Sequence, residues 1–161
     1  MAKFSNSNNS LYLNVYIDQG SQDISANSST VNWRLTVSRT GGYYTFNKQG
    51  DSSLSLNLDG RNVHSSRPTW ETSGEEYTLA RGSSSVSHNS DGSKSFPFSC
   101  TFNPNNGIHG TITVSSTFTL SPIARSSWVN DNALSGDRRL GSLHTLTIDR
   151  KSSSFTHQVW Y

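Results

Sequence analysis

The fold of this chain is decided by residues 86–102, which read VSHNSDGSKSFPFSCTF. The centre, residues 89–92 (NSDG), is turn chemistry, because Asn and Asp bond their own backbone and Gly takes a positive φ. After it, apolar side chains occupy every second position: Phe96, Phe98, Cys100 and Phe102. This period of two predicts a strand with one buried face. We interpret the stretch as a hairpin around which the other strands pack, and we expect His88 to cap its turn by a hydrogen bond.

The same alternation recurs along the chain and predicts roughly seven or eight strands with no helix. Strands are expected within residues 11–17, 28–39, 43–46, 51–59, 76–80, 83–88 and 111–120, whereas residues 1–9 are expected to be a loose lead-in. The fold class is therefore all-β: an antiparallel β-sandwich, immunoglobulin-like or jelly-roll-like, over residues 1–121.

The composition agrees with a sandwich in which half of every strand faces water. Of 161 residues, 31% are hydrophobic and only 15% are charged, so that Ser, Thr, Asn and Gly dominate. Disordered chains are usually rich in charge and poor in aromatic residues, whereas this chain is 11% aromatic. The composition is typical of an exposed β protein with polar outer faces.

Several functional classes are disfavoured by the same totals. A net charge of +2 with no basic block argues against a nucleic-acid partner. No apolar run approaches the ~20 residues of a membrane-spanning helix, so no membrane insertion is expected. The N-terminal residues contain no hydrophobic signal core, which predicts synthesis in the cytoplasm without a signal peptide. The single cysteine excludes an internal disulfide, and its position in phase with the Phe side chains predicts a buried, inert thiol.

A boundary is expected near Pro122, where the alternation stops. Residues 122–135 are interpreted as a linker and residues 136–161 as a β-hairpin that begins a second β unit. A hairpin alone is only marginally stable in water. Two alternatives follow: the hairpin docks on the sandwich, or the sequence is the front part of a longer protein.

Three short motifs occur in a fixed order: residues 86–95 (VSHNSDGSKS), residues 121–127 (SPIARSS) and residues 146–157 (LTIDRKSSSFTH). With the MAKF start, they resemble a family of minor structural, tail-associated proteins of siphophages that infect Gram-positive bacteria. The resemblance covers essentially the whole chain, although Ala124 and Arg125 stand in a different order from the family's commoner linker. It implies a virion component of the host-attachment apparatus at the distal tail, made in the bacterial host. It implies no enzyme.

The residues themselves favour neither catalysis nor metal binding. Ser, His and Asp are present, but no Gly-x-Ser-x-Gly elbow occurs between a strand and a helix. The five histidines are scattered without metal-ligand spacing. We therefore predict no catalytic residues, no metal and no cofactor.

Aromatic side chains offer the best candidates for a binding site, because exposed rings stack on sugars. Trp33 shares the apolar phase of its strand and is expected in the core, whereas Tyr12 and Tyr16 should stand on an outer face. The candidate residues for a glycan or partner are Trp70, Arg67 and Glu71 in the longest loop, together with Tyr43 and Tyr44 after a Gly-Gly break. In the alternative interpretation, Trp70 folds back and closes one end of the sandwich.

Two functions remain open. The first is a structural scaffold or spacer of a phage tail or tail tip, with other tail proteins as partners and with self-association as an option. The alternative is a carbohydrate-binding module that recognises host cell-wall polysaccharide.

Overall fold

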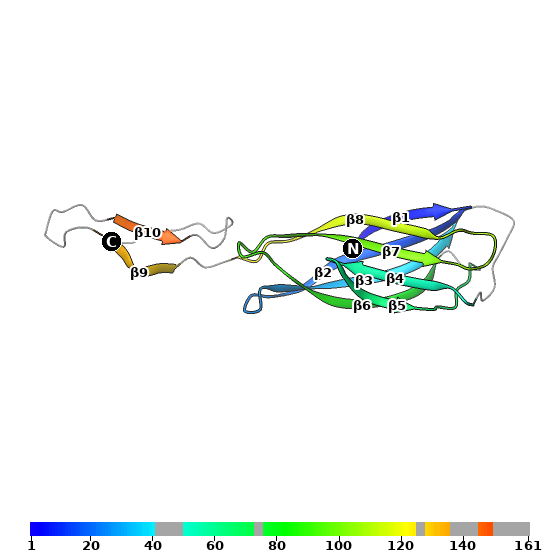
Figure 1. Ribbon diagram of the computed structural model, residues 1–161, viewed down its shortest axis with the longest axis horizontal. Coiled ribbons are helices and arrows are strands. Elements are labelled where there is room, and N and C mark those ends of the chain that lie inside the picture. Colours follow the sequence, from blue (N-terminus) through cyan, green and yellow to red (C-terminus); the bar gives the residue numbers. More distant parts are fainter. Residues whose placement is uncertain (41–49, 73–75, 125–127, 136–144, 150–161) are drawn as a thin grey trace.

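The computed structural model describes residues 1–40, 50–72, 76–124, 128–135 and 145–149 (Figure 1). The first eight strands in these residues form two antiparallel sheets of four strands each. Sheet I has the order β1 (Ala2–Asn8), β2 (Leu11–Asp23), β3 (Ser28–Arg39), β6 (Tyr77–Ser87). Sheet II has the order β5 (Arg61–Ser66), β4 (Ser53–Leu58), β7 (Lys94–Asn103), β8 (Ile112–Leu120). The predicted all-β antiparallel sandwich is confirmed.

The strand order defines two sides of the sandwich. It could not be predicted from the alternation of apolar and polar residues. On the β1–β8 side, the edge strand of sheet I contacts the edge strand of sheet II. On the β5–β6 side, the opposite edges of the two sheets border a cleft. The second strand pairs with the third here, whereas in an immunoglobulin domain the second strand pairs with the fifth.

The registers also define two ends. At the loop end, β1 turns into β2 after Asn8 and β7 leads into β8 after Asn103. At the exit end, β2 turns into β3 after Asp23 and the chain leaves β8 after Leu120.

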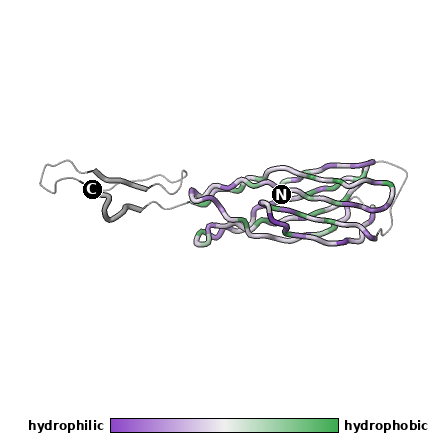
Figure 2. The backbone as a smooth tube through the Cα atoms, in the orientation of Figure 1, coloured by the Kyte–Doolittle hydropathy of each residue, from purple (hydrophilic) through white to green (hydrophobic). Residues whose placement is uncertain are grey.

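The core lies between the sheets and is built from the apolar phase of each strand (Figure 2). Trp33 is only 5% exposed and Cys100 is fully buried, as predicted. Burial raises the pKa of the Cys100 thiol to about 12, so the thiolate that would react is scarce at neutral pH. The other inward side chains of β2, β4 and β7 are Leu11, Leu13, Val15, Ile17, Leu54, Leu56, Leu58, Phe96, Phe98 and Phe102, all buried.

Residues 1–9 are not a loose lead-in, and this expectation is wrong. They form β1, which pairs with β2 along its whole length. Three of its side chains, one aromatic and two amides, make contacts on the β1–β8 side. Phe4 packs edge-on against Phe98 with ring centroids 4.8 Å apart. Asn6 donates to the carbonyl oxygen of Thr113 at 2.8 Å, and the Asn8 side chain accepts from the Gly110 amide at 2.9 Å. Amide side chains thus close the β1–β8 side without a hydrophobic period.

The stretch that decides the fold is not a hairpin, and this interpretation is also wrong. β6 pairs with β3 in sheet I, whereas β7 pairs with β4 and β8 in sheet II. The turn at residues 89–92 therefore carries the chain from one sheet to the other. The turn chemistry itself is as predicted: Gly92 has φ +82° and donates to Asn89 at 2.9 Å, and Nδ1 of His88 donates to the Gly92 carbonyl at 2.7 Å. Turn residues fix a reversal, but the buried faces decide which strand becomes the partner.

Two further segments differ from expectation. Residues 77–87 form one continuous strand rather than two pieces, with a bulge opposite Leu35 and Thr36. β9 (Trp128–Ser135) occupies part of the range interpreted as a linker, and it pairs antiparallel with β10 (Thr145–Asp149) in a separate two-stranded sheet. The strand expected at residues 43–46 and the end of the expected hairpin, residues 150–161, lie outside the described residues.

Trp33 fills the interior at the β5–β6 side. Its indole Nε1 donates to the Ser84 hydroxyl at 3.3 Å, and its ring lies against His64 of β5 at a centroid distance of 5.2 Å. Gly82 is its cross-strand neighbour on β6. A Cβ at position 82 would lie 2.5 Å from Cζ2 of Trp33, so the indole can occupy this place only beside a glycine.

Candidate functional site

Trp70, the central residue of the predicted binding loop, is completely buried. Its ring meets Phe102 edge-on at a centroid distance of 5.7 Å and His109 at 6.4 Å. The indole therefore closes the loop end of the sandwich, as in the alternative interpretation, and presents no ring surface on which a sugar could stack.

Two other predicted site residues, Arg67 and Glu71, flank Trp70 in this loop without contacting each other. Arg67 is exposed and Glu71 is half-buried, and no hydrogen bond or ion pair joins these two within the described part of the loop. Tyr43 and Tyr44 lie outside the described residues. The site that the sequence suggested is thus not assembled among the residues that can be placed.

Polar contacts complete the closure of the loop end. The Ser52 hydroxyl, fully buried, donates to the carbonyl oxygen of Pro68. The Asn106 carboxamide contacts Nδ1 of His109 at 3.0 Å, and its oxygen accepts from the His109 amide at 3.0 Å. Burial lowers the pKa of His109 against a smaller opposing effect of the Asn9 backbone. The described residues of the loop end therefore form a packed cap.

The outer face of sheet I carries a second polar cluster, centred on Glu76. One Glu76 carboxylate oxygen accepts from the Tyr16 hydroxyl at 2.7 Å and from the Asn14 amide at 3.2 Å, and the other faces the Arg34 guanidinium at 3.4 Å. Lys3 lies 3.8 Å away. The Arg34 guanidinium stacks on the Tyr16 ring at 4.3 Å. Tyr16 therefore stands on the outer face, as predicted, with its ring already occupied.

Asn14 connects this cluster to the strands around it. It is 1% exposed although it points away from the core. Its amide nitrogen also contacts Thr36 at 3.2 Å and Ser38 at 3.0 Å, while its oxygen accepts from Ser5 at 2.7 Å. Since these contacts link β1, β2 and β3, we interpret the cluster as a structural clasp.

Acid is expected to weaken this clasp. Burial raises the pKa of Glu76, but hydrogen bonds from Tyr16 and Thr36 and the charges of Arg34 and Lys3 outweigh it, so the pKa lies below its usual value of 4.5. A carboxyl group whose pKa is lower in the folded state stabilises that state at pH values above its unfolded pKa, and this contribution is lost as pH falls through the folded value. Replacing Glu76 by glutamine should cost about 1.5–3 kcal/mol at pH 7, the range for hydrogen bonds to a charged group.

Urea unfolding of the wild type and of Glu76→Gln between pH 7 and pH 3 measures this effect. The difference in unfolding free energy should narrow as the pH falls below the usual glutamate pKa of 4.5, and it should be lost as the pH falls through the lower pKa that Glu76 has in the folded state. Glu71→Gln is the control, and a change below about 0.5 kcal/mol is expected for it at pH 7. A difference that stays constant over the whole range would contradict the assignment.

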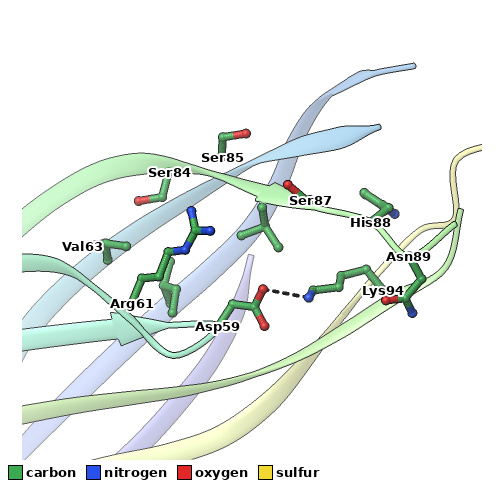
Figure 3. Close-up of a pocket in the computed structure, with 11 residues that line it drawn as sticks. Asp59, Arg61, Val63, Ser84, Ser85, Ser87, His88, Asn89 and Lys94 are labelled. Carbon is green, nitrogen blue, oxygen red and sulfur yellow. Dashed lines mark hydrogen bonds and ion pairs between the residues drawn. The ribbon is translucent and has the colours of Figure 1, made fainter. Parts of the chain in front are cut away.

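A cleft of about 210 Å³ opens on the β5–β6 side, and no sequence pattern indicates it (Figure 3). Its floor is apolar, with Leu58, Val63 and Val86. At one wall, Asp59 and Gly60 form a tight turn with φ of +51° and +76°, and the Asp59 amide donates to the Pro97 carbonyl at 2.9 Å.

Charged groups border this cleft. The Lys94 ammonium donates to Oδ2 of Asp59 at 2.7 Å, and Lys94 is 15% exposed. Arg61 extends from β5 across the cleft toward β6 (Figure 3). Asp59 and Lys94 are far apart in sequence, and nothing in their spacing indicates that the fold brings them into contact.

The exit segment, residues 121–124, is attached to the end of the sandwich. The Ser121 amide donates to Oε1 of Gln19 at 2.7 Å, and Nε2 of Gln22 donates to the Ser121 carbonyl at 2.8 Å. The Ile123 amide donates to the carbonyl oxygen of Gly92 at 2.9 Å. The Ile123 side chain is fully buried.

The same contacts reach His88 in the turn between the sheets. The Gly92 carbonyl accepts from both Ile123 and Nδ1 of His88, and Nε2 of His88 lies 2.7 Å from the Ser29 hydroxyl. The Gln19 amide donates to that hydroxyl at 3.1 Å. One hydrogen-bond network therefore joins the first residues after β8 to β2 and β3 of sheet I and to the turn between the sheets.

The described residues contain no group of three or more His, Cys, Asp or Glu side chains placed to hold a metal ion. These residues also include no helix that is long and apolar enough to cross a membrane.

Comparison with known proteins gives one result. The model of a family described as "Siphovirus protein of unknown function (DUF859)" matches residues 1–161. Neither the curated proteins nor the solved structures contain a match. Since the match spans the entire sequence, the chain belongs to this family of siphovirus proteins.

Proposed function

We propose that this chain is a structural component of the siphovirus virion, located in the tail or tail tip, where it serves as a scaffold or spacer for host attachment. The observation that carries the proposal is the attached exit segment. A spacer must transmit position from one part of a particle to the next, and a flexible tether at the domain boundary would not do so.

The junction in this chain is suited to that task. Pro122 restricts its own φ and removes one backbone donor. The residues on either side of it, Ser121 and Ile123, are hydrogen-bonded to the sandwich. The direction in which the chain leaves β8 is thus set by the sandwich.

The hydroxyl-rich outer surface of the sheets also supports a role as a structural component of the virion. Strand positions that face water carry mainly hydroxyl groups, such as Ser95 bonded to Thr119 at 2.9 Å and Thr101 bonded to Thr113 at 3.2 Å. Such ladders stabilise paired strands with little charge. We propose other tail proteins as the partners, with self-association as a second arrangement, and no catalytic role.

Immunogold electron microscopy of purified virions tests this proposal. An antibody raised against the full chain should label the tail, and we expect the label at the end distant from the capsid. Label confined to the capsid, or no label on virions that contain the chain by mass spectrometry of denatured particles, would contradict a tail position. Absence of the chain from purified virions would contradict a structural role altogether.

A further inference from the structure

The two sides of the sandwich differ in how they are closed. The β1–β8 side is bridged by the hydrogen bonds of Asn6 and Asn8 to residues 110 and 113. On the β5–β6 side, both sheets end in an edge strand and the cleft lies between them. An edge strand leaves every second backbone N–H and C=O without a partner in its own sheet, so this side offers unused donors and acceptors.

Arg61 is the uncompensated charge of this cleft. Among the described residues, the side chains of Lys3 and Arg34 pair with Glu76 and that of Lys94 pairs with Asp59. Arg61 is exposed, and no ion pair or hydrogen bond joins its side chain to another described residue. A guanidinium group presents a planar fork of donors that matches a carboxylate or a phosphate.

Asp59 supplies an acceptor in a fixed position. Only its Oδ2 is taken by Lys94, which leaves Oδ1 without a partner among the described groups. The tight turn and the ion pair hold the carboxylate in place. Across the cleft, Ser84 and Ser87 of β6 add hydroxyl groups; that of Ser84 already accepts from Trp33 at 3.3 Å and still has its own O–H to donate. His88 adds none, because both of its ring nitrogens are already in hydrogen bonds.

We propose that this cleft binds an acidic saccharide, that is, a sugar unit that carries a phosphate or a carboxylate group. Arg61 binds the anionic group, Oδ1 of Asp59 accepts a hydrogen bond from a sugar hydroxyl, and the serines of β6 bind further hydroxyls. This site is independent of the proposed role as a spacer.

The size and lining of the cleft restrict the ligand further. At about 210 Å³ the cleft is smaller than the roughly 300–1,000 Å³ of sites for drug-sized ligands, so it accommodates one ring or one terminal group. None of the described residues that line it is Phe, Tyr or Trp. Without a ring for stacking, a neutral sugar has only hydroxyl contacts, and the anionic group supplies the main attraction.

A titration followed by ¹H–¹⁵N NMR tests the proposal on the full chain at 50 mM salt. The probes are glucose 1-phosphate, glucuronate, glucose and inorganic phosphate. We expect the two acidic sugars to shift the amide signals of residues 59–63, 84–87 and 94, and glucose to shift none of them. Arg61→Gln should weaken binding of both acidic sugars at least tenfold. Lys3→Gln, which removes the same charge from the opposite edge of sheet I, should change it less than twofold.

Asp59→Asn tests the part of the site that binds a sugar hydroxyl separately from the part that binds the anionic group. Asn adopts a positive φ as readily as Asp, so the turn should be retained. Loss of the negative charge should strengthen binding of inorganic phosphate, while the preference for glucose 1-phosphate over phosphate should fall. If phosphate binds the wild type as tightly as glucose 1-phosphate, the recognition of hydroxyls is wrong. If Arg61→Gln and Lys3→Gln have equal effects, or if poly-glutamate alone shifts these signals, the cleft is not a saccharide site.

Discussion

Replacing Trp70 by alanine is expected to lower the free energy of unfolding by about 3–5 kcal/mol, the range for removing a large aromatic side chain from a core. The ring is fully buried and contacts Phe102 and His109. Its removal leaves a cavity at the loop end. Pro68 accepts a hydrogen bond from Ser52, and this bond keeps it from moving into the cavity. Since small domains are stable by only about 5–15 kcal/mol, this is a large share of the total.

Urea denaturation followed by tryptophan fluorescence measures this change, and Trp70→Phe is the matched control. Phenylalanine retains the edge-on contact with Phe102, so its cost should be clearly smaller than that of alanine. A Trp70→Ala variant with wild-type stability would show that the ring does not close the sandwich in solution. Loss of binding to wall polysaccharide with unchanged stability would restore the role first considered for this residue.

The second large effect is expected at Ile123. Replacement by alanine should cost about 2–5 kcal/mol, because the side chain is fully buried at the exit end. The loss of stability should also be concentrated at the exit end of the sandwich. The amides of residues 121 and 123, which donate to Gln19 and Gly92, should exchange with solvent faster than in the wild type.

Hydrogen exchange measured by NMR and urea denaturation together test this prediction. Ile108→Ala is the matched control, since Ile108 is 52% exposed and its truncation should cost less than about 0.5 kcal/mol. Equal effects of the two substitutions would mean that the exit segment is not attached to the sandwich, and the proposed spacer would lose its main support.

The alternation of apolar and hydroxyl side chains was sufficient to predict the sandwich and most of its core. It placed Trp33, Phe98 and Cys100 in the interior and Tyr16 on the outer face, because a strand has only two faces and the period assigns each residue to one. The capping contact of His88 was predictable too, since it depends on residues within the same turn.

What the sequence could not show depends on contacts between distant elements. Phe4 is the one hydrophobic residue of β1 that packs against the core, and the side chains of Asn6 and Asn8 make the other contacts, so the sequence of β1 shows no strand-like period. Residues 89–92 predicted a hairpin wrongly, because the same turn residues serve in a hairpin and in a crossing between two sheets. Trp70 stands in an aperiodic loop, where exposure and burial give the same sequence pattern. At the cleft, Asp59 forms an ion pair with Lys94, and these two residues are distant in sequence and meet only in the folded chain.

The hydrogen bonds of Asn6 and Asn8, which hold β1 on the β1–β8 side, have a consequence for the chemical ageing of the molecule. Asparagine loses ammonia slowly in water and becomes aspartate. At Asn6 that reaction would replace a donor with an anion facing the carbonyl oxygen of Thr113, so attraction would turn into repulsion. At Asn8 the oxygen already accepts from Gly110, and a carboxylate there would keep its partner. Long storage should therefore loosen the N-terminal strand through one asparagine and spare its neighbour.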